Sequence, residues 1–293
     1  MICFGFIIKL LISLDIDYNF LANPKVILSI ICLGAVYGII IYLLGYTWKL
    51  NLDYYSEKRS SFLLAVVIYS KSNIAKYIPG NIFQYAGRNA YSRRLGLDHI
   101  RIVASTVTEI IMLCFTCLLW CLILARENLF SIICYYSVFI NLRIIIVFLI
   151  ILVIMAVIIY LYYCRNRTLF NAFKPNKCKG LVRLLLIDFV FYSVVLLSFT
   201  FIFIIIVSWS ALVTKQTIGI IMSAYLISWI CGFLIPGAPG GLGVREIILS
   251  LLLKDFYVVE VIMMAVVIQR VISILGDVFA WIAATLIEQW KCI

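Results

Sequence analysis

The chain has 293 residues, of which 66% are apolar and only 13% are charged. A soluble domain carries about 45–50% apolar and about 25% charged residues, so this composition excludes a water-soluble protein and predicts one integral membrane domain over residues 1–293. The net charge of +11 is concentrated in short connections between apolar runs. That pattern is typical of cytoplasmic loops facing anionic headgroups, and we expect no binding of nucleic acid.

Each membrane crossing takes about 20 apolar residues, so the length predicts an all-α, polytopic transmembrane bundle of roughly seven to nine helices. The first apolar run, Met1–Leu14, is short and lacks a signal-peptide cleavage site, so we expect either an interfacial helix or a true start codon that lies upstream. Val26–Trp48 is an uninterrupted apolar stretch and predicts the first spanning helix. Phe62–Ile78 contains several polar residues and ends at Pro79-Gly80, which indicates a buried or re-entrant segment.

Ile102–Ala125 predicts a second span, which contains Glu109. The next apolar run, Leu129–Tyr163, is too long for one helix. Polar residues at 141–143 divide it, so we expect a short interfacial piece followed by a span over Ile144–Tyr163.

Three apolar runs complete the chain. Leu184–Val207 predicts a span with Asp188 near its start, and Ile218–Ile235 ends at a turn rich in proline and glycine. The last run, Val258–Ile287, contains charged residues. Because an intramembrane charge costs roughly 2.5–3.5 kcal/mol on insertion scales, we expect such residues to pair, to face the bundle interior or to lie near an interface.

Two basic loops are predicted to be cytoplasmic, because Lys and Arg concentrate on that side of the membrane. Two spans lie between the loops, which is consistent with this placement. We also expect the tryptophans at span ends, Trp48, Trp209 and Trp290, to anchor the chain at the interfaces. The residues of the two loops are Arg88, Arg93, Arg94 and Arg101, and Arg165, Arg167, Lys174, Lys177, Lys179 and Arg183.

The cysteines and the single histidine indicate neither a metal nor a redox site. The spacing of Cys114 and Cys117 formally matches a metal pair, but no second pair or nearby histidine completes a site. We interpret these cysteines as small buried side chains. We expect no catalytic residue, no cofactor and no metal.

Two segments share a pattern that predicts an internal repeat. Each has a Pro-Gly break after an apolar run and an arginine nine residues past the proline. The prolines are Pro79 and Pro236 and the arginines are Arg88 and Arg245, so both pairs are 157 residues apart. Interrupted helices at matching places in two halves are a pointer to a transporter's binding site, although ordinary surface turns are the alternative.

The second segment has a specific physical character. Proline breaks the helix, glycines permit positive φ, and a helix restarts near Arg245 with free N–H groups that favour an anion. A cation in the first turn of a helix is disfavoured by the helix dipole. Arg245 therefore predicts a compensating partner, either an acidic residue such as Glu246 or a bound phosphate.

Together the two segments resemble the flippase-like membrane domain of the lysylphosphatidylglycerol synthase family. The resemblance covers nearly the whole chain, although the first helix looks truncated and Ala238 separates the Pro-Gly and Pro-Gly-Gly elements. The string from Pro239 to Glu246 is its most specific part. The residues that carry it are Lys76, Pro79, Gly80, Gly87, Arg88, Gly96, Glu109, Pro239, Gly240, Gly241, Leu242, Gly243, Val244, Arg245, Glu246 and Arg270.

The resemblance implies a multi-helix fold with re-entrant segments and a role in moving or handling a lipid. In the fused synthases a separate soluble domain aminoacylates the lipid; we expect no such domain in these 293 residues and do not carry that activity over. We expect lipid phosphate to contact Arg88, Arg245, Arg270, Gly240, Gly241 and Gly243, with support from Lys76, Pro79, Gly80, Glu109, Pro236, Pro239 and Glu246.

The hypothesis from sequence is a flippase-like transporter of an anionic phospholipid or a polyprenyl-phosphate-linked glycan, working in cell-envelope assembly. One alternative is a membrane-embedded transferase acting on lipid-linked sugars, with Glu109 or Glu246 as the base. Another is a non-transporting membrane subunit that partners glycan-assembly enzymes. The sequence has no Walker loop for ATP binding.

Overall fold

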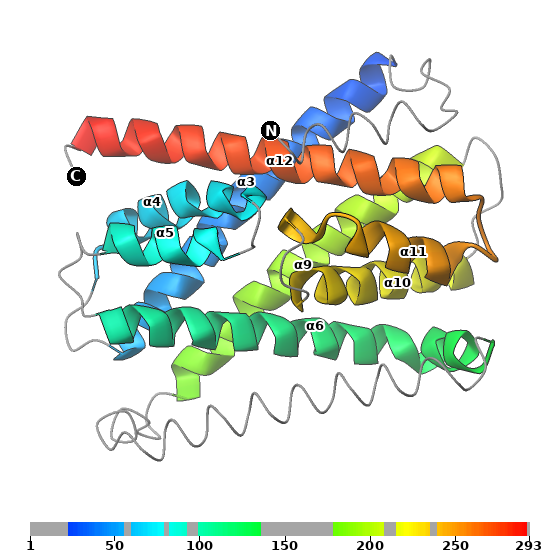
Figure 1. Ribbon diagram of the computed structural model, residues 1–293, viewed down its shortest axis with the longest axis horizontal. Coiled ribbons are helices and arrows are strands. Elements are labelled where there is room, and N and C mark those ends of the chain that lie inside the picture. Colours follow the sequence, from blue (N-terminus) through cyan, green and yellow to red (C-terminus); the bar gives the residue numbers. More distant parts are fainter. Residues whose placement is uncertain are drawn as a thin grey trace.

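The computed structural model describes residues 23–55, 60–78, 82–92, 99–135, 178–207, 215–234 and 239–291. These residues form an all-α bundle (Figure 1). In chain order its elements are α3 (Pro24–Tyr55), α4 (Phe62–Asn73), the 3-10 turn η1 (Ile74–Tyr77), α5 (Phe83–Ser92), α6 (His99–Tyr135), α9 (Cys178–Val207), α10 (Lys215–Leu234), the 3-10 turn η4 (Pro239–Gly241), α11 (Val244–Leu253) and α12 (Val259–Lys291).

Four of the described helices are long and apolar enough to cross a membrane, which confirms the prediction of a helical membrane protein. They contain the stretches Pro24–Asp53, His99–Cys117, Leu185–Val207 and Val259–Trp290. A fifth apolar stretch, Ile218–Phe233 in α10, is shorter. The predicted interfacial helix Met1–Leu14 and the predicted span Ile144–Tyr163 lie outside the described residues.

Some predicted boundaries were wrong. Arg88 lies within α5 and is buried, Arg101 belongs to the first turn of α6, and Lys179 and Arg183 belong to α9, rather than to loops. α6 also continues past Ala125 to Tyr135, since no proline or glycine interrupts it there. Charged residues are compatible with helix ends near headgroups, because their long side chains reach the interface.

The interfacial role predicted for Trp48 was also wrong. Its side chain is fully buried, and its ring lies 6.3 Å from that of Tyr69. Trp290, at the end of α12, is 89% exposed, as an anchoring residue would be. Trp209 lies outside the described residues. The cysteine interpretation was correct for Cys114 and Cys117, which are both buried.

The predicted repeat extends over whole helices. Shifting the bounds of α3 by 157 residues gives 181–212, close to the bounds of α9, and the same shift brings α6 to 256–292, close to those of α12. Between them, the pair α4–α5 corresponds to the pair α10–α11. Each half is therefore a long helix, two shorter helices separated by a break, and a second long helix.

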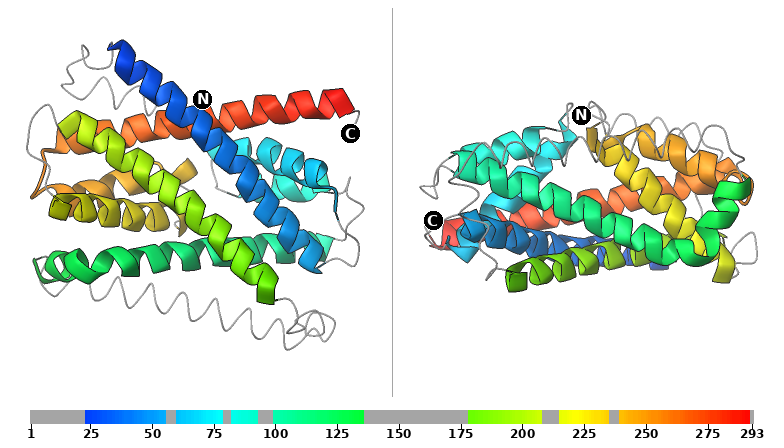
Figure 2. Two further views of the ribbon diagram at one scale, coloured as in Figure 1. Left: turned by 180° about the vertical axis from the view of Figure 1, so that it is seen from behind. Right: turned by 90° about the horizontal axis from the view of Figure 1, so that it is seen from below.

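The two halves are arranged as an inverted pair. α6 and α12 run in opposite directions along opposite edges of the molecule in Figure 1, and the pairs α4–α5 and α10–α11 lie between them. Behind these, α3 and α9 cross the bundle in opposite directions, as the reverse view in Figure 2 shows. A half-turn about the viewing axis of Figure 1 thus exchanges equivalent elements.

α3 and α12 cross at a close contact between glycines. A Cβ added to Gly276 would lie 2.8 Å from the carbonyl oxygen of Gly34 and 2.9 Å from the amide nitrogen of Gly38. The spacing of Gly34 and Gly38 is the small-residue pattern that lets membrane helices approach closely. This crossing places Tyr37 of α3 and Asp277 of α12 toward the centre of the bundle.

We expect Gly276→Ala to destabilise the protein by about 1–3 kcal/mol, because the added methyl group would meet backbone atoms that cannot move away easily. Gly87→Ala is the matched control, since its Cβ would meet only the Cβ of Ser72 at an ordinary 3.7 Å. Thermal unfolding of the purified proteins in detergent measures the difference. Equal melting temperatures for the two variants would contradict this account of the crossing.

Candidate functional site

The tips of the two interrupted segments meet at the centre of the bundle. η1 and η4 are in contact there, with the Tyr77 ring beside Gly240. Next to this contact lies a cavity of about 130 Å³, lined by residues of both halves. A water needs about 10–15 Å³ of cavity, so the space holds several waters or a group the size of a phosphate.

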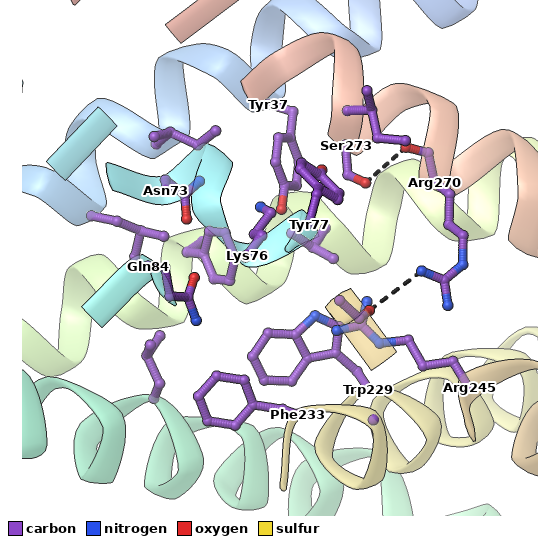
Figure 3. Close-up of a pocket in the computed structure, with 18 of the residues that line it drawn as sticks. Tyr37, Asn73, Lys76, Tyr77, Gln84, Trp229, Phe233, Arg245, Arg270 and Ser273 are labelled. Atoms are coloured by element: carbon purple, nitrogen blue, oxygen red, sulfur yellow. Dashed lines mark hydrogen bonds between the residues drawn. The ribbon is translucent and has the colours of Figure 1, made fainter. Parts of the chain in front are cut away.

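Most predicted site residues that the structure describes lie at this cavity. Figure 3 shows Arg245, Arg270 and Lys76 around it, together with Trp229 and Tyr77. Pro79, Gly80 and Pro236 lie outside the described residues, and Pro239 is the first residue of η4. The predicted residues that line the cavity are Lys76, Arg88, Glu109, Gly240, Arg245 and Arg270.

Arg88 is buried in the first half and held by a carboxylate. It is 2% exposed and forms an ion pair with Glu109 of α6, which also accepts a 2.8 Å hydrogen bond from the Tyr69 hydroxyl. The Arg88 guanidinium lies over the Tyr69 ring, 4.1 Å from its centroid. The charge of Arg88 is thus balanced by Glu109, the residue expected to hold this arginine in place.

Arg270 binds the residues at the helix interruption in the second half. Its Nε donates to Glu246 at 2.6 Å, and its terminal nitrogens donate to the carbonyl oxygens of Gly240 and Gly241 at 3.3 and 3.0 Å. Figure 3 shows the bond to the Gly240 carbonyl. Glu246 also accepts the Gly243 N–H at 2.9 Å and so caps the first turn of α11.

The glycine turn therefore differs in part from the prediction. Gly240, Gly241 and Gly243 have positive φ values of 58°, 75° and 83°, as expected for residues that only glycine adopts easily. In the described contacts, however, the turn presents carbonyl acceptors to Arg270, and Glu246 already occupies the Gly243 N–H. We had expected the turn to offer backbone donors to a phosphate.

Lys76 joins the first interrupted segment to α12. Its ammonium lies 2.6 Å from Asp277, which is fully buried and also accepts hydrogen bonds from Asn73 at 2.8 Å and Tyr77 at 2.5 Å. The described polar contacts of this carboxylate come from the end of α4 and from η1. Asp277 therefore fixes the tip of the first segment against the last helix.

Arg245 lacks a carboxylate partner among the described residues. Of the two partners predicted for Arg245, an acidic residue such as Glu246 or a bound phosphate, Glu246 instead forms its ion pair with Arg270. The Arg245 guanidinium lies 5.4 Å from the centroid of the Trp229 ring, and its buried Nε has no hydrogen-bond partner in the described part of the chain. Among the described cations that line the cavity, Arg245 alone stands without an anion.

Two glycines make room for this side chain. A Cβ on Gly232 of α10 would lie 2.6 Å from Arg245 Cγ, and a Cβ on Gly241 would lie 2.8 Å from its Nε. Neither Gly232 nor Trp229, the aromatic neighbour, was predicted from the sequence. A tryptophan in the interior of an apolar run, away from the interfaces, was the available signal for that residue.

No protein-family model, no curated protein and no solved structure matches this chain. The resemblance to the lysylphosphatidylglycerol synthase membrane domain therefore depends on the residues quoted above and serves below as support for a proposal.

We expect Gly241→Ala to destabilise the protein more than Gly243→Ala does. Both positions have positive φ, which costs a residue with a Cβ roughly 1–2 kcal/mol. Only at Gly241 would the Cβ also meet Arg245 and the Gly232 backbone, whereas nothing lies within 4 Å of the Cβ position at Gly243. Melting temperatures measured side by side give the steric part as the difference. A lower melting temperature for Gly243→Ala would refute the packing described for Arg245.

Proposed function

We propose that this protein is a flippase-like, multi-pass protein of the cell membrane that binds and translocates an anionic lipid in cell-envelope assembly. The ligand's phosphate would belong to a phospholipid or to a polyprenyl-phosphate-linked glycan, and it would enter the central cavity. The observation that carries this proposal is Arg245, a cavity-lining cation without a carboxylate.

The charges around the cavity support an anionic ligand. Arg88, Arg270 and Lys76 are each matched by a carboxylate, and Arg245 adds one positive charge that no described residue balances. A buried charge without a partner costs several kcal/mol, and the helix dipole adds to that cost in the first turn of α11. A phosphate oxygen placed against Arg245 would remove this penalty through a charge-assisted hydrogen bond.

The inverted arrangement supports translocation. Transporters built from inverted repeats bind substrate near the bilayer midplane, where discontinuous helices of the two repeats meet. Here the breaks in both halves meet beside the cavity, and α4–α5 and α10–α11 flank it from opposite ends of the bundle. The resemblance to a lipid-translocating domain agrees with this reading.

The two alternatives have less support. The predicted transferase would use Glu109 or Glu246 as its base, whereas Glu109 is engaged by Arg88 and Tyr69, and Glu246 by Arg270 and the Gly243 amide. A purely structural subunit would gain nothing from an arginine left without a counter-ion.

The distribution of basic residues supports a cytoplasmic location for one end of the bundle. The C-terminal ends of α3 and α12 and the N-terminal ends of α6 and α9 lie together toward the left of Figure 1. These ends bear Lys49, Lys291, Arg101, Lys179 and Arg183.

We expect single cysteines at positions 93 and 177, introduced into a chain without native cysteines, to react with an impermeant reagent only after the membrane is opened. Both positions lie in the predicted cytoplasmic loops and outside the described residues. Labelling of either position from outside intact cells would show that the proposed topology is inverted or incorrect.

We expect Arg245→Gln to reduce the occupancy of co-purified anionic lipid about tenfold or more without lowering thermal stability. The loss of one charge-assisted bond is worth about 1.5–3 kcal/mol, and the variant removes an unbalanced buried charge. Native mass spectrometry measures occupancy on the preparations used for melting curves.

Two matched variants separate binding from folding. Arg88→Gln leaves Glu109 buried without its cation and should lower stability by about 3–5 kcal/mol. Arg183→Gln changes an exposed arginine on α9 and should alter neither property. Normal lipid occupancy in folded Arg245→Gln would end the proposal of a phosphate site at this residue.

A further inference from the structure

A second buried ionisable group, Asp188 of α9, lies one turn away from the cavity. Its side chain is 1% exposed, and its Oδ1 has no hydrogen-bond partner among the residues that the structure describes. The sequence left open whether this residue is simply near the headgroups. The structure shows that protein buries it, so its carboxylate is not solvated in the way that a headgroup location would allow.

The position of Asp188 on its helix connects it to the cavity. Phe191 and Val195 follow it by three and seven residues, so all three lie on one face of α9, and both of these neighbours line the cavity. Across the interface, the Glu109 carboxylate is close enough to act electrostatically on Asp188. Glu109 lines the same cavity and holds Arg88.

The other helices packed around α9 offer Asp188 no described cation. Among the described residues, Glu109 is the charged group that acts on it. The remaining polar or ionisable groups that face α9 near its contacts are Cys114 and Cys117 of α6, Tyr37 of α3, Tyr225 of α10 and the neutral Gln269 of α12, with Tyr192 on α9 itself.

We propose that Asp188 is a proton-binding site that is linked to anion binding in the central cavity. A buried carboxylate with an oxygen that no described residue bonds, on a helix that packs against the helix of Glu109, fits its site as the neutral acid. The proton comes from water and binds a carboxylate oxygen, so no other reactant is required.

The linkage follows from the shared location and rests on the proposed function. An anion beside Arg245 adds negative charge to the cavity and favours protonation of Asp188. A proton on Asp188 in turn removes a negative charge near the cavity and favours the anion. Thermodynamic linkage makes the two effects equal, and couplings of this kind change affinity by about 5- to 150-fold.

The first experiment tests the proton site without any lipid. Melting temperatures of the full chain are measured in mildly acidic and mildly alkaline buffer for the wild type, Asp188→Asn and Glu260→Gln, an exposed carboxylate on α12. Alkaline buffer forces the buried carboxyl of the folded state to ionise, so wild type and Glu260→Gln should lose stability as the pH rises. Asp188→Asn should lose at least about 2 °C less.

Asp188→Glu keeps a carboxyl group and should restore the pH dependence, which makes the test valid even if Asp188→Asn folds poorly. A pH profile of Asp188→Asn equal to that of the wild type, or an Asp188→Glu profile that lacks the pH dependence, would overturn the proton site.

The second experiment tests the linkage. Short-chain phosphatidylglycerol is titrated into each protein by calorimetry, in two mildly alkaline buffers that differ in ionisation enthalpy, so that Asp188 can ionise before the lipid binds. The wild type and Glu260→Gln should take up protons on binding, and Asp188→Asn should take up none. Lipid binding by the wild type without proton uptake would overturn the linkage and leave the proposed function intact. No binding of anionic lipid by the wild type would remove both the linkage and the proposed function, while the melting experiment still decides the proton site.

Discussion

The ion pair between Arg270 and Glu246 stabilises the turn that interrupts the helical structure between α10 and α11. In an apolar environment every backbone donor and acceptor must find a partner inside the protein. Arg270 supplies donors to the carbonyls of Gly240 and Gly241, and Glu246 accepts the Gly243 amide at the start of α11. Because Glu246 is engaged by Arg270 and by the Gly243 amide, it does not form an ion pair with Arg245.

The two halves have the same construction but different charges. In each half an ion pair joins the second short helix to the long helix that follows it, yet the arginine is on the short helix in the first half and on the long helix in the second. The repeat therefore gives equivalent positions to Arg88 and Arg245 without giving them equivalent partners. This difference leaves a single unbalanced cation at a site between two otherwise similar halves.

The sequence predicted the helical membrane fold well, because apolar runs and Pro-Gly breaks are local signals. It also predicted that Arg88, Arg245 and Arg270 belong together, since the repeat and the cost of intramembrane charge both point to a shared interior. It did not predict which carboxylate binds which cation. Lys76 and Asp277 are 201 residues apart, so their pairing depends on how α4 and η1 pack against α12. The burial of Trp48 and Asp188 was not predicted for the same reason, because the sequence around a tryptophan or aspartate near the end of a span does not indicate whether its side chain is buried.

The glycine crossing of α3 and α12 has a mechanical consequence for the pair of halves. The equivalent contact in the repeat is the packing of α9 against α6. There, Phe191 and Val195 of α9 stand at the positions equivalent to Gly34 and Gly38. Leu119 of α6 stands at the position equivalent to Gly276. Backbones locked by glycine resist sliding, whereas bulky side chains such as the stacked rings of Trp120 and Phe189 hold two helices further apart. We infer that the closely packed α3–α12 crossing is the pivot for any rocking of one half against the other.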